Sequence, residues 1–162
     1  MRTSLIHEKC DGGNGWSGSC ARSSGKGVVF NSKSIEKVDA SVFEGVFRRP
    51  RYEDYSFWRI PWTIEHLLTG RGQGRVLPPD VFPNRSTDAI EQVILIFIDG
   101  FGWRHLERYS ERFPVFRRFM EDGVVTKLTS MFPSTTTSHV TGVHTGLATV
   151  NSGLSEWFQY HD

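Results

Sequence analysis

An uninterrupted apolar run lies at residues 93–98 and stops abruptly at Asp99 and Gly100. A strand with one face in water would alternate apolar and polar residues, whereas this run is apolar at every position and rich in β-branched side chains. Such a run is typical of a central parallel strand that is covered on both faces. We therefore predict a strand that ends in a carboxylate, at the edge where α/β proteins place their functional groups. The alternative is that Asp99 and Gly100 only form the turn that closes a buried strand.

A second strand and a helix are predicted on either side of five consecutive hydroxyl side chains at residues 134–138. Residues 123–131 have the apolar content of a short strand, and apolar residues recur at helical spacing after Thr136. The hydroxyl run therefore lies where a strand leads into a helix N-terminus, whose N–H groups and partial positive charge can hold an anion. Helix capping accounts for one such hydroxyl but does not require five.

The remaining apolar pattern predicts shorter elements. We expect a short strand at residues 28–30, a weak helix around Ile35 and Val38, and a helix at residues 60–69 that ends at Gly70. The expected apolar face of the helix at residues 60–69 consists of Ile64, Leu67 and Leu68.

Two more helices are expected between Asp99 and the second strand. The first begins soon after Asp99, and the second opens at Pro114 and ends at Gly123. The inward side chains of the second are expected to be Val115, Phe116, Phe119 and Met120. Strand, helices, strand and helix together form a right-handed crossover unit, so the predicted fold class is α/β with a mainly parallel sheet.

Composition narrows the possible functions of the chain more than it narrows the possible folds. A chain of 162 residues, 38% hydrophobic and 23% charged, can bury one globular core. Its net charge of +1 gives no argument for binding nucleic acid or an acidic membrane surface, and we interpret its aromatic residues as core. No window approaches the roughly 20 apolar residues of a membrane span. The first residues also lack the apolar core of a signal peptide, which favours a cytoplasmic location.

Residues 1–50 are interpreted as an extension that is poorly ordered, because residues 1–27 are dominated by glycine and serine. Two motifs in residues 1–27 lack residues that a P-loop or a structural zinc site requires. Gly25-Lys26 lacks the Ser or Thr that ends a P-loop, and no strand precedes it. His7, Cys10 and Cys20 supply three ligands where a structural zinc site needs four.

Residues 51–162 resemble the N-terminal portion of the catalytic domain of the alkaline phosphatase superfamily, and within it the type I phosphodiesterase/nucleotide pyrophosphatase branch. The resemblance lies in four segments and in the spacing from Asp99 to the Pro-Ser-x-Thr turn; the segments are residues 98–103, 132–136, 144–147 and 153–157. It implies the first two or three strands of an alkaline-phosphatase-like α/β/α sandwich.

The resemblance also implies an active site. It makes Asp99 a ligand of one of two divalent metal ions, zinc with manganese as the alternative, and it makes Thr136 both the nucleophile and a ligand of that ion. Thr135 is the competing hydroxyl. The implied reaction is hydrolysis of phosphodiester or nucleotide pyrophosphate bonds in a small-molecule substrate through a covalent phospho-threonine. A threonine hydroxyl is a poor nucleophile at neutral pH, and coordination to a metal ion lowers its pKa.

Two observations separate this chain from better-known relatives. His139 stands where nucleotide pyrophosphatases have an asparagine, and residues 151–153 lack a histidine that is common there. Downstream of Thr136 the chain has few candidate metal ligands, namely Glu156, Asp162, His139, His144 and His161. The remaining ligands of the resembled family are expected beyond residue 162, so we expect this chain to be the N-terminal part of a longer enzyme and to be inactive alone.

Other functions stay open at this point. A phosphomutase or sulfatase relative would share Asp99 and a nucleophile at the same turn, although the modified Cys or Ser motif of sulfatases is missing. A noncatalytic binding or scaffold module with the same fold is the alternative from a different class. The sequence does not predict an oligomeric state or one particular substrate.

Overall fold

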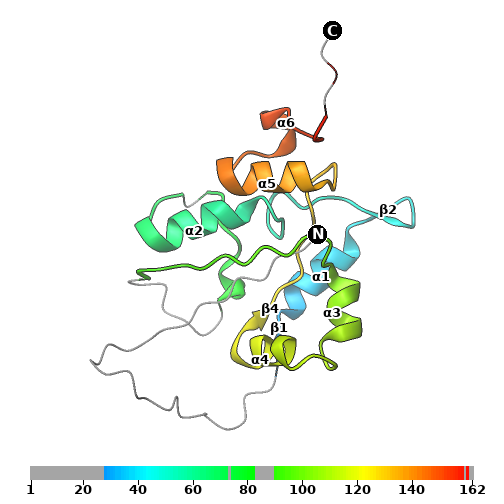
Figure 1. Cartoon of the computed structure of the whole chain (residues 1–162), viewed down its shortest axis with the longest axis vertical. Coiled ribbons are helices and arrows are strands. Elements are labelled where there is room, and N and C mark those ends of the chain that lie inside the picture. The colour runs from blue at the N-terminus through cyan, green and yellow to red at the C-terminus, as the bar shows by residue number, and fades with distance from the viewer. Residues whose placement is uncertain (1–27, 73, 83–89, 159, 161–162) are drawn as a thin grey trace.

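The structure, a computed structural model, describes residues 28–72, 74–82, 90–158 and 160 (Figure 1). Several residues considered above lie outside the described residues, namely His7, Cys10, Cys20, Gly25, Lys26, His161 and Asp162.

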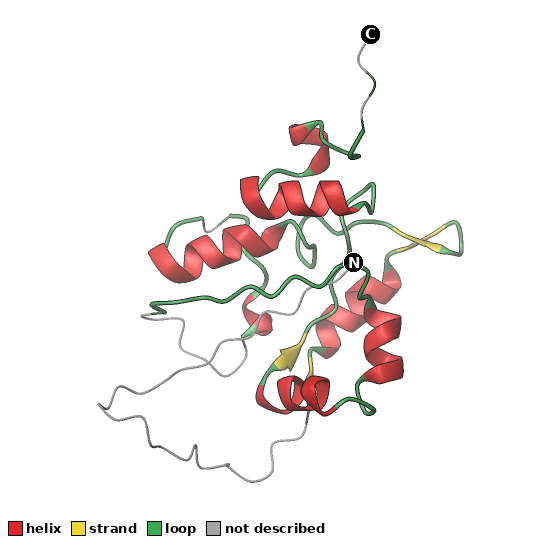
Figure 2. Cartoon of the chain, viewed as in Figure 1, coloured by secondary structure: helices red, strands yellow, loops and turns green. Residues whose placement is uncertain are grey.

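Helices make up most of the regular structure (Figure 2). The α-helices are α1 (Ser32–Ala40), α2 (Arg59–Thr69), α3 (Trp103–Tyr109), α4 (Pro114–Asp122), α5 (Thr136–Thr145) and α6 (Thr149–Ser152), and one 3-10 turn, η1, spans Pro79–Val81. The strands are β1 (Val29–Phe30), β2 (Val42–Phe43), β3 (Phe47–Arg48) and β4 (Val124–Val125). Among the described residues, no helix is long and apolar enough to cross a membrane.

A parallel pair of strands joins the beginning of the described chain to its middle. β1 pairs with β4 in the register Val29 to Val124 and Phe30 to Val125. The predicted short strand at residues 28–30 is therefore confirmed, and so is the α/β fold class, here as a partial α/β fold with a parallel sheet of two strands. β2 and β3 form a separate antiparallel hairpin.

The weak helical pattern after β1 is confirmed as α1, and local polar contacts explain where that helix begins. The Asn31 side chain accepts a hydrogen bond from the backbone N–H of Ser34 (3.0 Å), which satisfies one of the N–H groups that a helix start leaves free. The buried Ser34 hydroxyl in turn accepts the N–H of Lys127 just after β4 (3.0 Å). The start of α1 is thus tied directly to the β4 segment.

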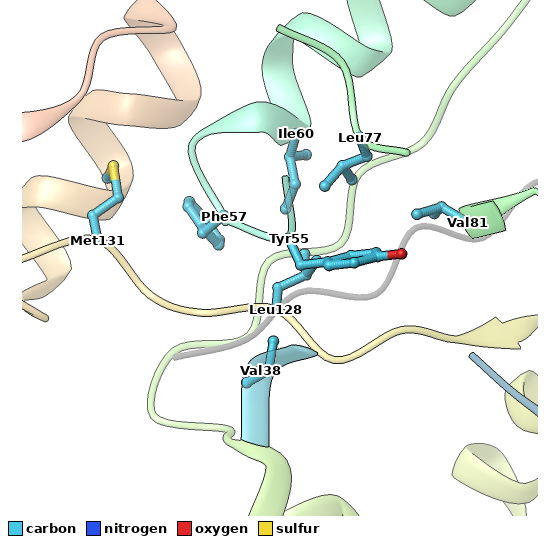
Figure 3. Packing of buried hydrophobic residues seen from close by; sticks show 8 residues of the cluster. All are labelled: Val38, Tyr55, Phe57, Ile60, Leu77, Val81, Leu128 and Met131. Carbon is cyan, nitrogen blue, oxygen red and sulfur yellow. The ribbon is translucent and has the colours of Figure 1, made fainter. Parts of the chain in front are cut away.

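One cluster of buried side chains forms the core (Figure 3). It draws on α1, the segment before α2, α2 itself, the η1 region and the segment after β4; its members are Val38, Tyr55, Phe57, Ile60, Leu77, Val81, Leu128 and Met131. Met131 is the last of these before the hydroxyl run, and it is fully buried. The turn that carries the hydroxyl run therefore starts from a fixed point in the core.

The predicted helix at residues 60–69 is confirmed as α2; of its expected face, Leu67 is buried and Ile64 packs against the core, but Leu68 does neither. Ile60, Thr63 and Leu67 are buried, whereas Leu68 is 44% exposed. Thr63 can be buried because its hydroxyl donates to the carbonyl of Arg59 (2.7 Å) and accepts the N–H of Leu77 (2.9 Å). Apolar spacing alone does not show that a threonine can satisfy its hydroxyl in this way.

The two helices expected between Asp99 and β4 are confirmed as α3 and α4. The predicted inward face of α4 is confirmed for Met120, which is buried, and in part for Phe116, which is half-buried, but it was wrong for Val115 and Phe119, which are 55% and 40% exposed. In the described part of the chain α4 packs against β4, and a two-residue strand offers too little surface to cover a whole helix face.

The predicted strand at residues 93–98 is not present as such. Ile94 forms a β-bridge, but no named strand of the described residues includes this segment, and it is not covered on both faces. Its odd-numbered side chains are half-buried, with Leu95 and Phe97 packed against the core, whereas Ile94, Ile96 and Ile98 are 66%, 53% and 46% exposed. An apolar run shows that both faces favour burial, but within the described residues only one face meets a core.

Candidate functional site

Asp99 lies at the end of the extended segment, beside the core. Phe97, two residues earlier, anchors the segment by packing edge-on against Phe57 with a centroid distance of 5.6 Å. Gly100 then takes a left-handed backbone conformation, with φ of 68°, which favours glycine and turns the chain away. Asp99 is exposed at this turn.

The segment after Asp99 is held by aromatic packing. Phe101 stacks on Phe116 of α4 with a centroid distance of 5.0 Å, and it contacts His105 of α3 at 5.9 Å. These contacts fix the loop on the far side of Gly100, so the Asp99 carboxylate is carried between two packed aromatic side chains, Phe97 and Phe101.

The hydroxyl run begins α5, as predicted. Thr135 is the N-cap residue, and its side chain accepts the backbone N–H of Ser138 (3.4 Å). The same hydroxyl donates to the carbonyl of Ser155, and it lies 3.0 Å from the Ser138 hydroxyl. Thr135 is therefore engaged in closing the start of the helix.

Thr136 is the hydroxyl that faces Asp99. Its Oγ1 donates to both carboxylate oxygens of Asp99, at 3.4 Å to Oδ1 and 3.3 Å to Oδ2. Thr136 is half-buried and Asp99 is exposed, so the pair is open to solvent. The structure brings together the two residues that the sequence singled out, although they are 37 positions apart.

The other hydroxyls of the run have different surroundings. Ser134 donates to the carbonyl of Met131 (3.1 Å) and lies 2.7 Å from the Ser130 hydroxyl. Thr137 and Ser138 are buried, at 9% and 1% exposure. Among the five hydroxyls, Thr136 is thus the one placed to meet a molecule that arrives beside Asp99.

His139 was not predicted to have a structural role, and the structure buries it behind the turn that carries the hydroxyl run. Its ring is fully buried against Phe57, edge-on, at a centroid distance of 4.7 Å. Both ring nitrogens meet backbone groups: Nε2 accepts the N–H of Met131 (3.2 Å), and Nδ1 lies 2.7 Å from the carbonyl of Thr135. Burial lowers the pKa of His139, so the ring is neutral at pH 7. His139, which stands where nucleotide pyrophosphatases have an asparagine, therefore forms hydrogen bonds with backbone groups of the turn.

The donor set at the site fits part of a divalent metal centre. Two oxygen ligands of one ion, each at about 2.1 Å and at a tetrahedral angle, lie about 3.4 Å apart. The Thr136 and Asp99 oxygens have nearly this separation, and both are of the hard type that zinc and manganese accept. In the part of the chain that the structure describes, no group of three or more His, Cys, Asp or Glu side chains could hold a metal ion. Asp99 and Thr136 can therefore supply two ligands but do not complete a site.

A cavity of about 580 Å³ lies elsewhere, beside the β2–β3 hairpin. Residues 40–44, 49–51 and 53 line it, and neither Asp99 nor Thr136 is among them. Because Asp99 is exposed and Thr136 is half-buried, a substrate could reach this pair directly from solvent.

Comparison with known proteins finds a family match in the same region of the chain. Residues 93–160 match the family model described as Type I phosphodiesterase / nucleotide pyrophosphatase. The match covers Asp99, the whole hydroxyl run and α5, and it begins after the core residues contributed by α1 and α2. No curated protein and no solved structure matches the chain.

Proposed function

Because residues 93–160 match the type I phosphodiesterase/nucleotide pyrophosphatase family model, we propose that the protein hydrolyses phosphodiester or nucleotide pyrophosphate bonds with Thr136 as the nucleophile. The observation that carries this proposal is the contact between the Thr136 hydroxyl and both oxygens of Asp99 at the start of α5. Thr135, the alternative nucleophile, is less suited because its hydroxyl caps the helix and bonds to the Ser155 carbonyl.

Thr136 and Asp99 are the residues to which we assign the first chemical step. Thr136 Oγ1 attacks phosphorus, the bond from phosphorus to the leaving alcohol or phosphate breaks, and a phospho-threonine forms. The Asp99 carboxylate, which already accepts the Thr136 hydroxyl, would take its proton and pass it to the oxygen of the leaving alcohol or phosphate. Water then hydrolyses the phospho-threonine and restores the hydroxyl.

The N-terminus of α5 can also bind the negatively charged phosphate group of the substrate. The N–H groups of Thr136 and Thr137 belong to the first turn of α5, where a helix supplies no carbonyl partners. These groups, together with the partial positive charge at a helix N-terminus, attract the non-bridging phosphate oxygens. The phosphate would thus be held where the Thr136 hydroxyl can reach it.

We further propose that Asp99 and Thr136 hold one of two divalent metal ions, zinc or manganese. Bound metal would lower the pKa of the Thr136 hydroxyl and stabilise charge on the leaving oxygen. The other ligands would come from outside the described residues. The substrate class is a small phosphate ester or nucleotide, in keeping with the open surface of the site and the net charge of +1.

The test is hydrolysis of bis(4-nitrophenyl) phosphate by the full natural polypeptide that carries this chain, with zinc or manganese added. Thr136→Ala should abolish turnover while leaving the circular dichroism spectrum unchanged, and Asp99→Asn should remove the metal dependence. Thr145→Ala, at the exposed opposite end of α5, is the matched control and should keep wild-type turnover. Turnover that survives Thr136→Ala but is lost in Thr135→Ala would transfer the role to Thr135.

A further inference from the structure

His139 joins the two ends of the turn that carries the candidate nucleophile. The turn leaves the core at Met131 and enters α5 at Thr135, and the His139 ring bonds to the backbone at both residues. The Met131 N–H can only donate, so Nε2 must be the unprotonated nitrogen. Nδ1 then carries the proton and donates it to the Thr135 carbonyl. A single neutral tautomer therefore satisfies both contacts.

The ring is enclosed by the core. It is fully buried, and Phe57 packs against it edge-on. The buried Met131 side chain also packs closely on α5, because its methyl group lies against Gly142, where an added Cβ would come within 2.6 Å of it. The next backbone group of the turn, the N–H of Phe132, donates to the Tyr52 hydroxyl (3.0 Å). The beginning of the turn is thus held by side chains from two other parts of the fold.

We propose that His139 is a positioning residue, which clamps residues 131–135 so that the Thr136 hydroxyl faces Asp99. This inference rests on the proposed function, in which Thr136 is the nucleophile. Nucleophiles must be held within about 0.5 Å of their productive position. The Thr135 cap fixes only the helix side of the turn, whereas the His139 bond to Met131 fixes the strand side. The alternative to a positioning role is a purely structural one, in which His139 only satisfies buried backbone groups of the core.

Two substitutions separate the two ring contacts. The amide of asparagine lies near the Nδ1 position, so His139→Asn can keep the contact with Thr135 but not the one with Met131. The amide of glutamine reaches the Nε2 position, so His139→Gln keeps the Met131 contact and loses the other. His144→Gln is the matched control, because His144 is exposed on the same helix.

The first readout needs no activity. Long-range ¹H–¹⁵N NMR of the wild-type chain at pH 8 should show His139 protonated at Nδ1, and the opposite tautomer would overturn the proposal. Nuclear Overhauser contacts between the Thr136 methyl group and the Asp99 β-protons should be present in wild type and in His144→Gln. They should weaken in His139→Asn and His139→Gln; unchanged contacts in both folded variants would also overturn it.

The second readout is the split between kcat and KM in the full natural polypeptide. Both His139 variants should lose roughly tenfold to a hundredfold in kcat, as expected when a reacting group is misplaced, with little change in KM. Unchanged kcat in the two folded variants would refute the positioning role. If wild type shows no turnover at all, the proposed function fails, and the NMR contacts then decide the role of His139 by themselves.

Discussion

The far end of α5 offers a quantitative test of how this helix is anchored. α5 ends at Gly146, which has φ of 68° and whose N–H donates to the Gly142 carbonyl at 2.8 Å. The Trp62 ring of α2 lies directly over it, and Trp62 Nε1 donates to the Gly146 carbonyl at 2.7 Å. A Cβ added at Gly146 would lie 2.9 Å from two ring carbons of Trp62. Gly146→Ala should therefore destabilise the chain for two separate reasons.

Gly70 supplies a control that isolates one of these reasons. It ends α2 with φ of 73° and donates to the His66 carbonyl at 2.8 Å, yet nothing lies within 4 Å of an added Cβ. Gly70→Ala should cost only the left-handed backbone penalty, about 1–2 kcal/mol. Gly146→Ala should cost that amount plus about 1–3 kcal/mol for overpacking against Trp62.

Urea denaturation of the two variants, followed by circular dichroism, measures the difference in the free energy of unfolding. We expect Gly146→Ala to be less stable than Gly70→Ala by at least about 1 kcal/mol. Equal losses in the two variants would refute the close packing of Trp62 on the end of α5. The same result would remove the anchor that we infer between α2 and the helix that begins at Thr136.

Three further predictions concern the start of α5 and the metal. Burial lowers the pKa of His139 below its ordinary value of 6.5, so the unfolded chain binds the proton more readily. Stability should be retained above about pH 6.5 and fall as the pH drops below it, and His139→Leu should flatten this dependence in urea titrations. Thr135→Ala should cost about 1 kcal/mol through loss of the N-cap, whereas Thr136→Ala should cost clearly less in the same titration. Calorimetric titration of the 162-residue chain with manganese should show weak binding, because Asp99 and Thr136 supply only two ligands. An assay of the same chain on bis(4-nitrophenyl) phosphate should show no turnover. Tight manganese binding that Asp99→Asn abolishes would contradict this prediction.

The parts of the fold that depend on local chemistry could be predicted from the sequence. Gly70 and Gly123 mark helix ends, and Pro114 marks a helix start, because each acts through its own backbone. The helix after the hydroxyl run was predictable for the same reason, since Thr135 caps it with its own side chain. The proximity of Asp99 to Thr136 required a family resemblance, because nothing local brings together residues 37 positions apart.

The parts that depend on distant neighbours could not be predicted. The run at residues 93–98 favours burial on both faces, but only the side with Leu95 and Phe97 meets the core in the described residues. The sequence singled out His139 as standing in place of an asparagine and as a candidate metal ligand, but not as a buried residue of the turn. Its burial depends on the turn folding back until the Met131 N–H reaches the ring, and no sequence pattern reports that closure.

The most direct test of the central claim is mass spectrometry of the full natural polypeptide, quenched in acid during turnover of bis(4-nitrophenyl) phosphate. If Thr136 is the nucleophile, the peptide that contains residues 132–145 should carry a nitrophenyl phosphoryl group, and fragmentation should place it on Thr136. The adduct should be missing in Thr136→Ala and present in Thr145→Ala. An adduct on Thr135, or sustained turnover by Thr136→Ala, would contradict the account.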